Sequence, residues 1–276
     1  QAEDGIRDRS PSRGLGDVYK RQLYDNRRPT VFTGAYSEVY TYGKALEILK
    51  GRLNDRYAIY VKHLDSAYQV HLPDDAAQTR IMIHISNEVF YDDTDYEQFD
   101  FVFRFYLPER CDGQKVFPIP LGVSSHGKVD YDYGPNPRLQ ERSNNIFFKG
   151  QIHHREAFAA ALKQVSIPNS LIEFTDGFRG GDDLASYHHK LDQSKIVLVP
   201  GGLSPETFRY AEAFARGCCV ITDEPPGQWW HEGSPARFIQ DWNQVGEVIQ
   251  ETLASTSETT HLDNRRYCLL YTSDAA

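Results

Sequence analysis

Hydrophobic and polar residues follow one another in two successive series of short β-rich runs and helical stretches. The first series predicts a helix at residues 37–53, whose apolar residues recur at helical spacing, and strands at residues 30–33, 57–62, 80–85, 99–105 and 115–119. The second series predicts strands at residues 145–149, 171–175, 195–200, 218–222 and 236–240. Its helices are predicted at residues 154–164, 183–193, 205–216 and 245–253.

Several of these strands are apolar on both faces and are bounded by helices, a pattern typical of parallel sheets covered by helices. Residues 128–144 are rich in Gly, Pro, Asp, Tyr and Arg, have no hydrophobic period and are predicted to be a linker. We therefore expect an α/β protein with two Rossmann-like domains, residues 23–140 and 141–267, and a cleft between the domains.

Both ends of the chain resemble translated sequencing adapters fused to reading frames from environmental DNA. Residues 1–22 carry mixed charges and three glycines without periodicity, and residues 268–276 (CLLYTSDAA) look like the adapter of the other end. We treat both segments as non-native and leave them out of the predicted fold. The native protein is then expected to be truncated at one or both ends.

Composition narrows the class of protein. The chain has 276 residues, of which 40% are hydrophobic and 25% charged, as in folded domains. A formal charge of −9 argues against a general nucleic-acid binder but not against a local basic pocket for a phosphorylated ligand. Four cysteines without a disulfide framework suit a cytoplasmic protein, with membrane association left open. No apolar run approaches the roughly 20 residues that a membrane-spanning helix needs.

The most informative segment begins where a predicted buried strand runs into Gly201 and Gly202. A helix is predicted to follow, with Ser204 as its N-cap, Pro205 at its first position and Glu206 in its first turn. The free N–H groups of such a helix start bind anions, and the two glycines allow a diphosphate to approach the backbone. Ligands of open α/β sheets bind beyond the carboxyl ends of the strands. We therefore predict that a ligand with a diphosphate group binds at this segment.

Arg209 and Glu212 are three residues apart on the same predicted helix, so their side chains lie near one another. One interpretation is that both face the ligand. The other is a plain strand-helix-strand unit in which the two residues pair on a helix surface, which is common and stabilises little. The residues alone leave both interpretations open.

The whole run KIVLVPGGLSPETFRYAEAFARGCCVITDEP resembles the donor-binding segment of exostosin-like glycosyltransferases. The resemblance implies a GT-B fold, with a nucleotide sugar held mainly by the second domain. It places Arg209 on the diphosphate, Glu212 on the ribose hydroxyls and Gly217 at a tight helix end. Many GT-B enzymes carry a second glutamate eight positions earlier, but Ser204 stands there in this chain, which favours an inverting mechanism.

A second segment, FFKGQIHHREAF, runs through a predicted strand and a Gly150 turn into a helix start. It carries Lys149 and Arg155, and in the same family this loop lies beside the phosphates. Arg155 would then stabilise the leaving diphosphate, with help from Lys149. The alternative for Arg155 is a solvated helix residue.

In the first half, RIMIHISNEVFYDDTDYEQFDFVFRFYLPE followed by PIPLG resembles an exostosin-related subfamily that includes the ribitol xylosyltransferases. The resemblance implies that Asn87 and Glu88 reach the cleft and that Arg104 and Tyr106 lie on the acceptor side. For Arg104, a buried ion pair at the sheet edge is the alternative.

An inverting enzyme needs a base that removes the proton of the acceptor hydroxyl. Glu88 is the first candidate, followed by Asp92 and Asp93, and its alternative role is to cap a neighbouring turn. No metal site is predicted, because the adjacent His153 and His154 lack the spacing of zinc ligands. The acidic run at residues 92–95 is interpreted as a surface loop.

These features together predict transfer of a sugar from a nucleoside diphosphate sugar to a hydroxyl acceptor on a glycan. The expected mechanism is direct displacement without a metal or other cofactor, and the expected source is bacterial. Nucleic acid is not an expected partner. The alternatives are a sugar-nucleotide epimerase or a phosphorylase on the same fold, or a non-catalytic module that binds nucleotide sugars or glycans.

Overall fold

The computed structural model describes residues 23–25, 57–63, 79–85, 88, 95–106, 108–122, 137–177, 183–223 and 228–273. The predicted strand at 30–33 and the predicted helix at 37–53 lie outside these residues. Asn87, Asp92 and Asp93 also lie outside them. The predictions made for these positions stay predictions.

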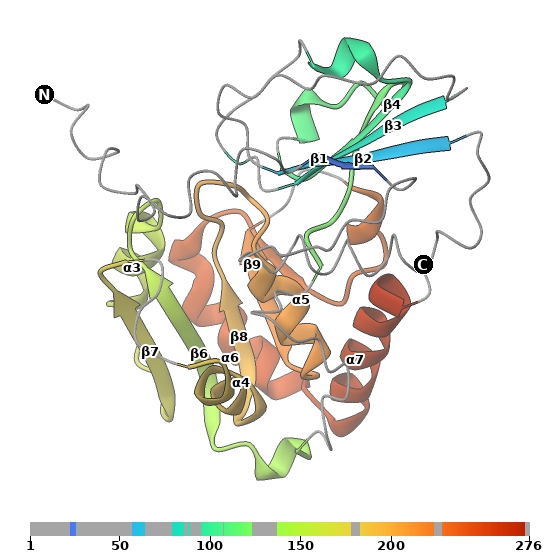
Figure 1. Cartoon of the computed structure of the whole chain (residues 1–276). Helices are drawn as coiled ribbons and strands as arrows, with labels where there is room; N and C mark the ends of the chain where they lie inside the picture. Colours follow the sequence, from blue (N-terminus) through green and yellow to red (C-terminus); the bar gives the residue numbers. More distant parts are fainter. Residues whose placement is uncertain are drawn as a thin grey trace, which may run out of the picture.

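The N-terminal half contains a five-stranded sheet in the order β1-β2-β3-β4-β5 (Figure 1). Its strands are β1 (Leu23–Asp25), β2 (Tyr57–His63), β3 (Thr79–Ile85), β4 (Phe101–Arg104) and β5 (Val116–Pro118). Strand β1 pairs with β2 in the antiparallel direction, whereas β2 to β5 are parallel. The predicted strands of this half that the structure describes are therefore confirmed, with β4 shorter than expected.

The C-terminal half contains a second five-stranded sheet, in the order β10-β9-β8-β6-β7, and all of its pairings are parallel. Its strands are β6 (Asn144–Gln151), β7 (Ser170–Thr175), β8 (Ser194–Val199), β9 (Cys219–Asp223) and β10 (Arg237–Ile239). The chain is thus an α/β protein with two separate sheets that are mainly or wholly parallel, as the sequence predicted.

Helices cover both faces of the second sheet because its central strand is apolar on both sides. Ile196 and Leu198 of β8 pack on the face covered by α3 (Glu156–Leu162) and α6 (Val245–Ser255). Val197 and Val199 pack on the opposite face. That face is covered by α4 (Leu184–Asp192), α5 (Phe208–Ala215) and α7 (Glu258–Ser273).

Helix α7 extends into the tail that was left out of the predicted fold. It continues through residues 268–273, and Cys268 is only 4% exposed. The cysteine packs in the same cluster as Phe214 of α5, and Tyr267 contacts the Phe214 ring edge-on at 5.1 Å between centroids. The structure thus includes residues 268–273 in a helix, and the non-native origin of the tail stays a prediction.

The predicted linker ends in ordered structure. Residues Leu139–Glu141 form a 3-10 helix, η4, and the buried Arg142 follows it. The Arg142 guanidinium donates hydrogen bonds to the carbonyl oxygens of Ser194 and Arg216, both at 2.6 Å. A longer bond of 3.3 Å reaches the carbonyl of Pro137. One side chain thus ties the start of the second half to β8 and to the end of α5.

The two halves are in direct contact. Phe208, the first residue of α5, packs against the cluster that contains Phe105, Tyr106 and Leu121 of the first half. The remaining short helices are η2 (Asp95–Gln98), η3 (Pro108–Arg110), η5 (Trp229–His231) and η6 (Trp242–Gln244).

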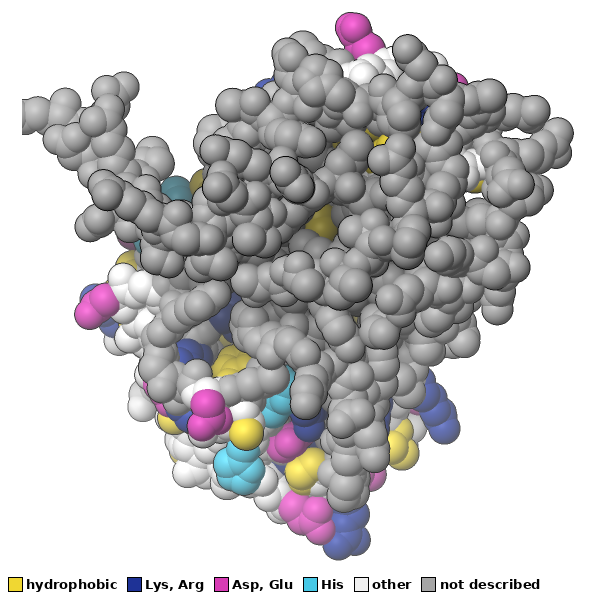
Figure 2. Space-filling model, in the orientation of Figure 1, with side chains coloured by type: hydrophobic (Ala, Val, Ile, Leu, Met, Phe, Trp, Pro, Cys, Tyr) yellow, Lys and Arg dark blue, Asp and Glu magenta, His cyan; other side chains and the backbone are white. Residues whose placement is uncertain are grey.

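The surface of the described residues carries charges of both signs. Figure 2 shows acidic and basic side chains close together on the visible part of the C-terminal half. Among the residues that the structure describes, no helix has both the length and the apolar character needed to cross a membrane.

Candidate functional site

The predicted site lies at the edge of the second sheet where its parallel strands end. Gly150 is near the end of β6, Gly201 and Gly202 follow β8, and Asp223 ends β9. Because these strands are parallel and adjacent, their carboxyl ends meet at one edge of the sheet. The three glycines therefore lie at the same edge of the sheet.

Arg155 reaches this edge from the N-cap position of α3. Its Nε donates a hydrogen bond to the Pro200 carbonyl and its Nη1 one to the Gln151 carbonyl, both at 3.3 Å. A Cβ atom on Gly202 would lie 2.7 Å from Arg155 Nη2, so this glycine leaves room for the guanidinium group. Arg155 therefore lies against the glycine pair that follows β8.

The electrostatic surroundings of Arg155 are those of a crowded basic site. Burial, followed by the nearby charge of Arg209, lowers the pKa of Arg155 to about 10. The charges of Glu88 and Asp223 act in the opposite direction. Two guanidinium groups that repel one another at a sheet edge form a favourable place for an anion with more than one charge.

Arg209 enters the same edge from the first turn of α5. Its Nη2 donates a hydrogen bond to the Lys149 carbonyl, and its guanidinium carbon lies 5.1 Å from the centroid of the Phe148 ring. Gly150 allows this approach, because a Cβ there would lie 3.1 Å from Arg209 Nη2. Arg209 Nε is buried and has no hydrogen-bond partner. Arg209, Gly150 and Arg155 thus lie at one edge of the sheet, and their role in binding a donor stays a prediction.

The segment from Ser204 to Thr207 differs from the prediction. Helix α5 begins at Phe208 with Thr207 as N-cap, so Ser204 is not the cap, Pro205 is not the first helical residue and Glu206 is not in the first turn. The physical reason is tertiary. The Gly202 N–H bonds the Ser204 carbonyl at 2.8 Å, which turns the chain back, and the Glu206 carboxylate contacts the first half of the chain.

Two hydroxyl groups of this loop have no partner. Ser204 is only 2% exposed, and neither its Oγ nor the buried Oγ1 of Thr207 makes a hydrogen bond. Buried polar atoms are almost always paired, so unpaired ones in the loop that follows Gly202 are candidates for hydrogen bonds to a ligand. Together with Arg209 Nε, they form a set of unsatisfied polar atoms within a few residues.

Glu206 joins the two halves of the chain. Its Oε1 accepts a hydrogen bond of 3.2 Å from the backbone N–H of Leu121, within the PIPLG segment. Burial raises the pKa of Glu206 to about 7, and the bond from Leu121 opposes this rise. The carboxyl group therefore titrates near neutral pH. Its predicted contact with the donor stays a prediction.

Glu212 lies on α5 close to Arg209, as expected from their spacing. Its Oε2 accepts a hydrogen bond of 3.1 Å from the hydroxyl of Tyr187 on α4. Sequence reasoning missed Tyr187, because nothing in the local pattern distinguishes it from other residues of an amphipathic helix.

Lys149 is placed differently from Arg155 and Arg209. Its ammonium group forms an ion pair of 2.9 Å with Glu173 on the neighbouring strand β7, and its side chain is 13% exposed. In this structure Lys149 contributes to the site through its backbone carbonyl, which holds Arg209. A direct contact of its ammonium group with a ligand stays a prediction.

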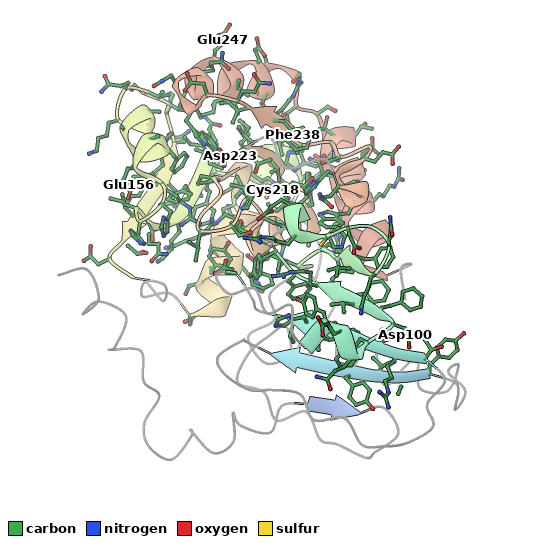
Figure 3. All side chains as sticks on the ribbon, turned by 90° about the horizontal axis from the view of Figure 1, so that it is seen from above. Asp100, Glu156, Cys218, Asp223, Phe238 and Glu247 are labelled. Carbon is green, nitrogen blue, oxygen red and sulfur yellow. The ribbon has the colours of Figure 1, made fainter. Side chains whose placement is uncertain are left out.

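Asp223 was not among the predicted site residues. One carboxylate oxygen accepts a hydrogen bond of 2.5 Å from the Gly201 N–H, and the other accepts one of 2.6 Å from the Trp242 indole N–H. Asp223 lies toward the middle of the C-terminal half in Figure 3, whereas Glu156 of α3 lies at its periphery. The sequence signal that could have identified Asp223 as a site residue is its position at the carboxyl end of a predicted strand.

In the first half, Glu88 is exposed and lies close enough to influence the pKa of Arg155. Arg104 is fully buried, with bonds of 3.2 Å from its Nη1 to the Tyr96 hydroxyl and from its Nε to the Phe105 carbonyl. Both of these partners are neutral, and the predicted acceptor-side role of Arg104 stays a prediction. Tyr106 is 8% exposed and lies in the contact between the halves.

The histidine pair at 153–154 has its ring centroids 3.9 Å apart. Among the described residues, no group of three or more His, Cys, Asp or Glu side chains is arranged to hold a metal ion.

No protein-family model matches the chain, and no curated protein matches it. A solved structure of the GtfA/B complex overlaps it with a TM-score of 0.44 and 14% identity, over 70% of this chain and 50% of that one. The structure of Anabaena HepE in complex with UDP overlaps it with a TM-score of 0.43 and 12% identity, over 70% of this chain and 68% of that one. The structure of the pneumococcal O-GlcNAc transferase GtfA in complex with UDP and GlcNAc overlaps it with a TM-score of 0.42 and 14% identity, over 72% of this chain and 51% of that one.

This chain thus spans about half the length of the first and third of these proteins. Because the overlaps are partial and the identities low, the function is inferred below from the residues of this chain.

Proposed function

We propose that the chain is a glycosyltransferase of the GT-B type that moves a sugar from a nucleoside diphosphate sugar to a hydroxyl group of a glycan. The observation that carries this proposal is the pair of guanidinium groups, Arg155 and Arg209, at the carboxyl edge of a parallel sheet. Three buried polar atoms without a hydrogen-bond partner, Ser204 Oγ, Thr207 Oγ1 and Arg209 Nε, belong to the loop after β8 and the start of α5. A ligand that carries both a diphosphate and sugar hydroxyl groups would pair with the two guanidinium groups and with the unpaired polar atoms.

In the proposed mechanism, the diphosphate of the donor lies between Arg155 and Arg209, beside the glycines. These two cations stabilise the negative charge that develops on the diphosphate as the glycosidic bond breaks. The ribose hydroxyls donate hydrogen bonds to Glu212. Positive charge comes from the protein, so this scheme needs no metal ion or other cofactor.

Glu88 is proposed as the base. A direct displacement forms the new glycosidic bond as the bond to the diphosphate breaks, and the proton of the acceptor hydroxyl passes to the carboxylate. Support comes from position, because Glu88 is exposed and its charge is felt by Arg155. This electrostatic interaction supports a location of the base candidate on the same side of the chain as the leaving-group site. Direct displacement gives inversion at the anomeric carbon.

The first test separates binding from chemistry. The protein is incubated with UDP- and GDP-sugars, with and without glycan acceptors, and product linkage and nucleotide release are measured. Arg209→Ala should lose donor binding, whereas Glu88→Gln should bind the donor with unchanged affinity but transfer sugar at least about 100-fold more slowly.

Arg138→Ala is the matched control for loss of a positive charge, because Arg138 forms an ion pair with Glu141 and its side chain is 65% exposed. It should leave binding and transfer unchanged. Interconversion of the donor without an acceptor would instead indicate an epimerase. Full activity of Glu88→Gln would exclude Glu88 as the base, and full donor binding by Arg209→Ala would exclude the proposed site.

A further inference from the structure

Tyr187 connects two of the proposed donor-binding residues. It lies on α4, and the centroid of its ring is 5.9 Å from that of the Phe147 ring on β6. Its hydroxyl donates a hydrogen bond of 3.1 Å to Glu212 Oε2. The same hydroxyl also interacts with the Arg209 guanidinium. One phenol therefore lies between the carboxylate and the guanidinium that face the edge of the sheet.

The protonation state of this phenol is fixed. Burial, followed by the charge of Glu212, raises the pKa of Tyr187 far above its ordinary value, and Arg209 offsets only part of the rise. At neutral pH the group is therefore a neutral donor. A neutral phenol next to a carboxylate has one favourable arrangement, in which its hydrogen points at the carboxylate oxygen.

This bond restricts the orientation of Glu212. A glutamate side chain on a helix surface rotates about several bonds, and its last bond has a broad preference. The bond from Tyr187 to Oε2 restricts the rotation of the carboxylate and thereby the directions that Oε1 can take. A carboxylate placed beside a diphosphate site accepts hydrogen bonds from neighbouring hydroxyl groups only if it is oriented toward them.

We propose that Tyr187 is a positioning residue that orients Glu212, so that the site distinguishes ribose from 2′-deoxyribose in the nucleotide of the donor. This inference rests on the proposed function, because it requires a nucleoside diphosphate at the sheet edge. Tyr187 itself does not contact the ligand. Its effect is on the geometry of the residues that do.

The experiment compares ribose and deoxyribose nucleotides. Dissociation constants of UDP, 2′-deoxy-UDP, GDP and 2′-deoxy-GDP are measured by calorimetry for the wild type and for Tyr187→Phe, which removes only the hydroxyl oxygen. The wild type should prefer the ribose form of the nucleotide that it binds. Tyr187→Phe should weaken binding of that form about tenfold and leave the deoxy form almost unchanged, so that the preference is lost.

Tyr210→Phe is the matched control. Its hydroxyl also makes a hydrogen bond, of 2.5 Å with Ser234 Oγ, but away from Glu212. It should keep the full ribose preference. A second variant, Glu212→Asp, shortens the side chain so that the carboxylate no longer reaches the Tyr187 hydroxyl. It should lose the preference as Tyr187→Phe does, and it tests the inference even if Tyr187→Phe does not fold.

The two possible failures are distinct. If the wild type binds none of the four nucleotides, the proposed function itself is wrong. If the wild type binds and prefers ribose, but Tyr187→Phe weakens both forms equally or neither form, then Tyr187 is a structural residue and the positioning role is refuted. Retention of the preference in Glu212→Asp would refute it as well.

Discussion

Replacement of Gly202 by alanine tests how Arg155 is held at the edge of the sheet. The added Cβ would lie 2.7 Å from Arg155 Nη2 and 3.3 Å from its Cζ, so the guanidinium must move. Movement breaks the bonds of 3.3 Å to the carbonyls of Pro200 and Gln151. Both are long and half-buried, so their combined contribution is about 1–2 kcal/mol, at the low end for charged donors.

Alanine also restricts the unfolded chain, which stabilises the fold by about 0.4–1 kcal/mol. The net loss in the free energy of unfolding for Gly202→Ala is therefore about 1 kcal/mol or less. Urea denaturation measures this loss. Gly177→Ala is the control, because a Cβ at Gly177 would meet no atom within 4 Å and should show only the stabilising effect.

A double-mutant cycle with Arg155→Met isolates the mechanism. In the Met background no guanidinium meets the new methyl group, so Gly202→Ala should be neutral or stabilising. The interaction energy should be about 1–2 kcal/mol. If Gly202→Ala destabilises both backgrounds by the same amount, the clash with Arg155 is not the cause and the account of this edge is wrong. Nucleotide affinity should fall with the displaced guanidinium, by about tenfold.

Three further predictions concern buried charged or titratable groups outside this contact. Glu206 has a pKa raised to about 7 from 4.5, so its burial destabilises the fold as pH rises through this range. Glu206→Gln should be more stable than the wild type above pH 7, by up to about 3 kcal/mol, and equal to it below pH 4.5. His261 has a pKa lowered by burial to about 4 from 6.5, so stability falls as pH drops from 6.5 toward 4, and His261→Phe should remove that loss. Because the two trends oppose one another, each single variant should show a steeper pH profile in urea denaturation than the wild type, and unchanged profiles would contradict both assignments. Arg142→Met leaves two carbonyls bonded at 2.6 Å without their donor and should cost about 3–5 kcal/mol in calorimetric unfolding, whereas a cost below 1 kcal/mol would show that these bonds contribute little.

The strands of the second sheet were predictable because their signal is local. Residues 196–200 are apolar at every position, and Gly201 follows directly. Burial on both faces selects such a run for a central parallel strand, whatever the rest of the chain does. The meeting of Gly150, Gly202 and Arg155 at one edge then follows from parallel pairing alone.

The start of α5 was not predictable from local chemistry. Ser204, Pro205 and Glu206 have the residue types of a helix start, but Glu206 instead bonds the N–H of Leu121, far away in the sequence. The contact with Leu121 outweighs the local preference for a helix N-cap at Ser204, because such a cap stabilises a helix by only about 1 kcal/mol. Arg142 and Tyr187 were missed for a related reason, since the partners of Arg142 lie about fifty and seventy residues further along the chain.

Lys149 was assigned to the donor site because it is basic and adjacent to Gly150. Side chains alternate along a strand, and Phe148 already faces α3, so Lys149 points to the opposite face. There it meets Glu173 at 2.9 Å. Alternation was visible in the sequence, but the partner on the neighbouring strand was not.

The carboxylate of Asp223 touches the glycine that follows β8 with one oxygen and the indole of Trp242 with the other. Indole emission responds to a charged acceptor at its N–H. A molecule that binds at that edge and moves Gly201 should therefore shift the fluorescence wavelength of Trp242, one of the three tryptophans of the chain.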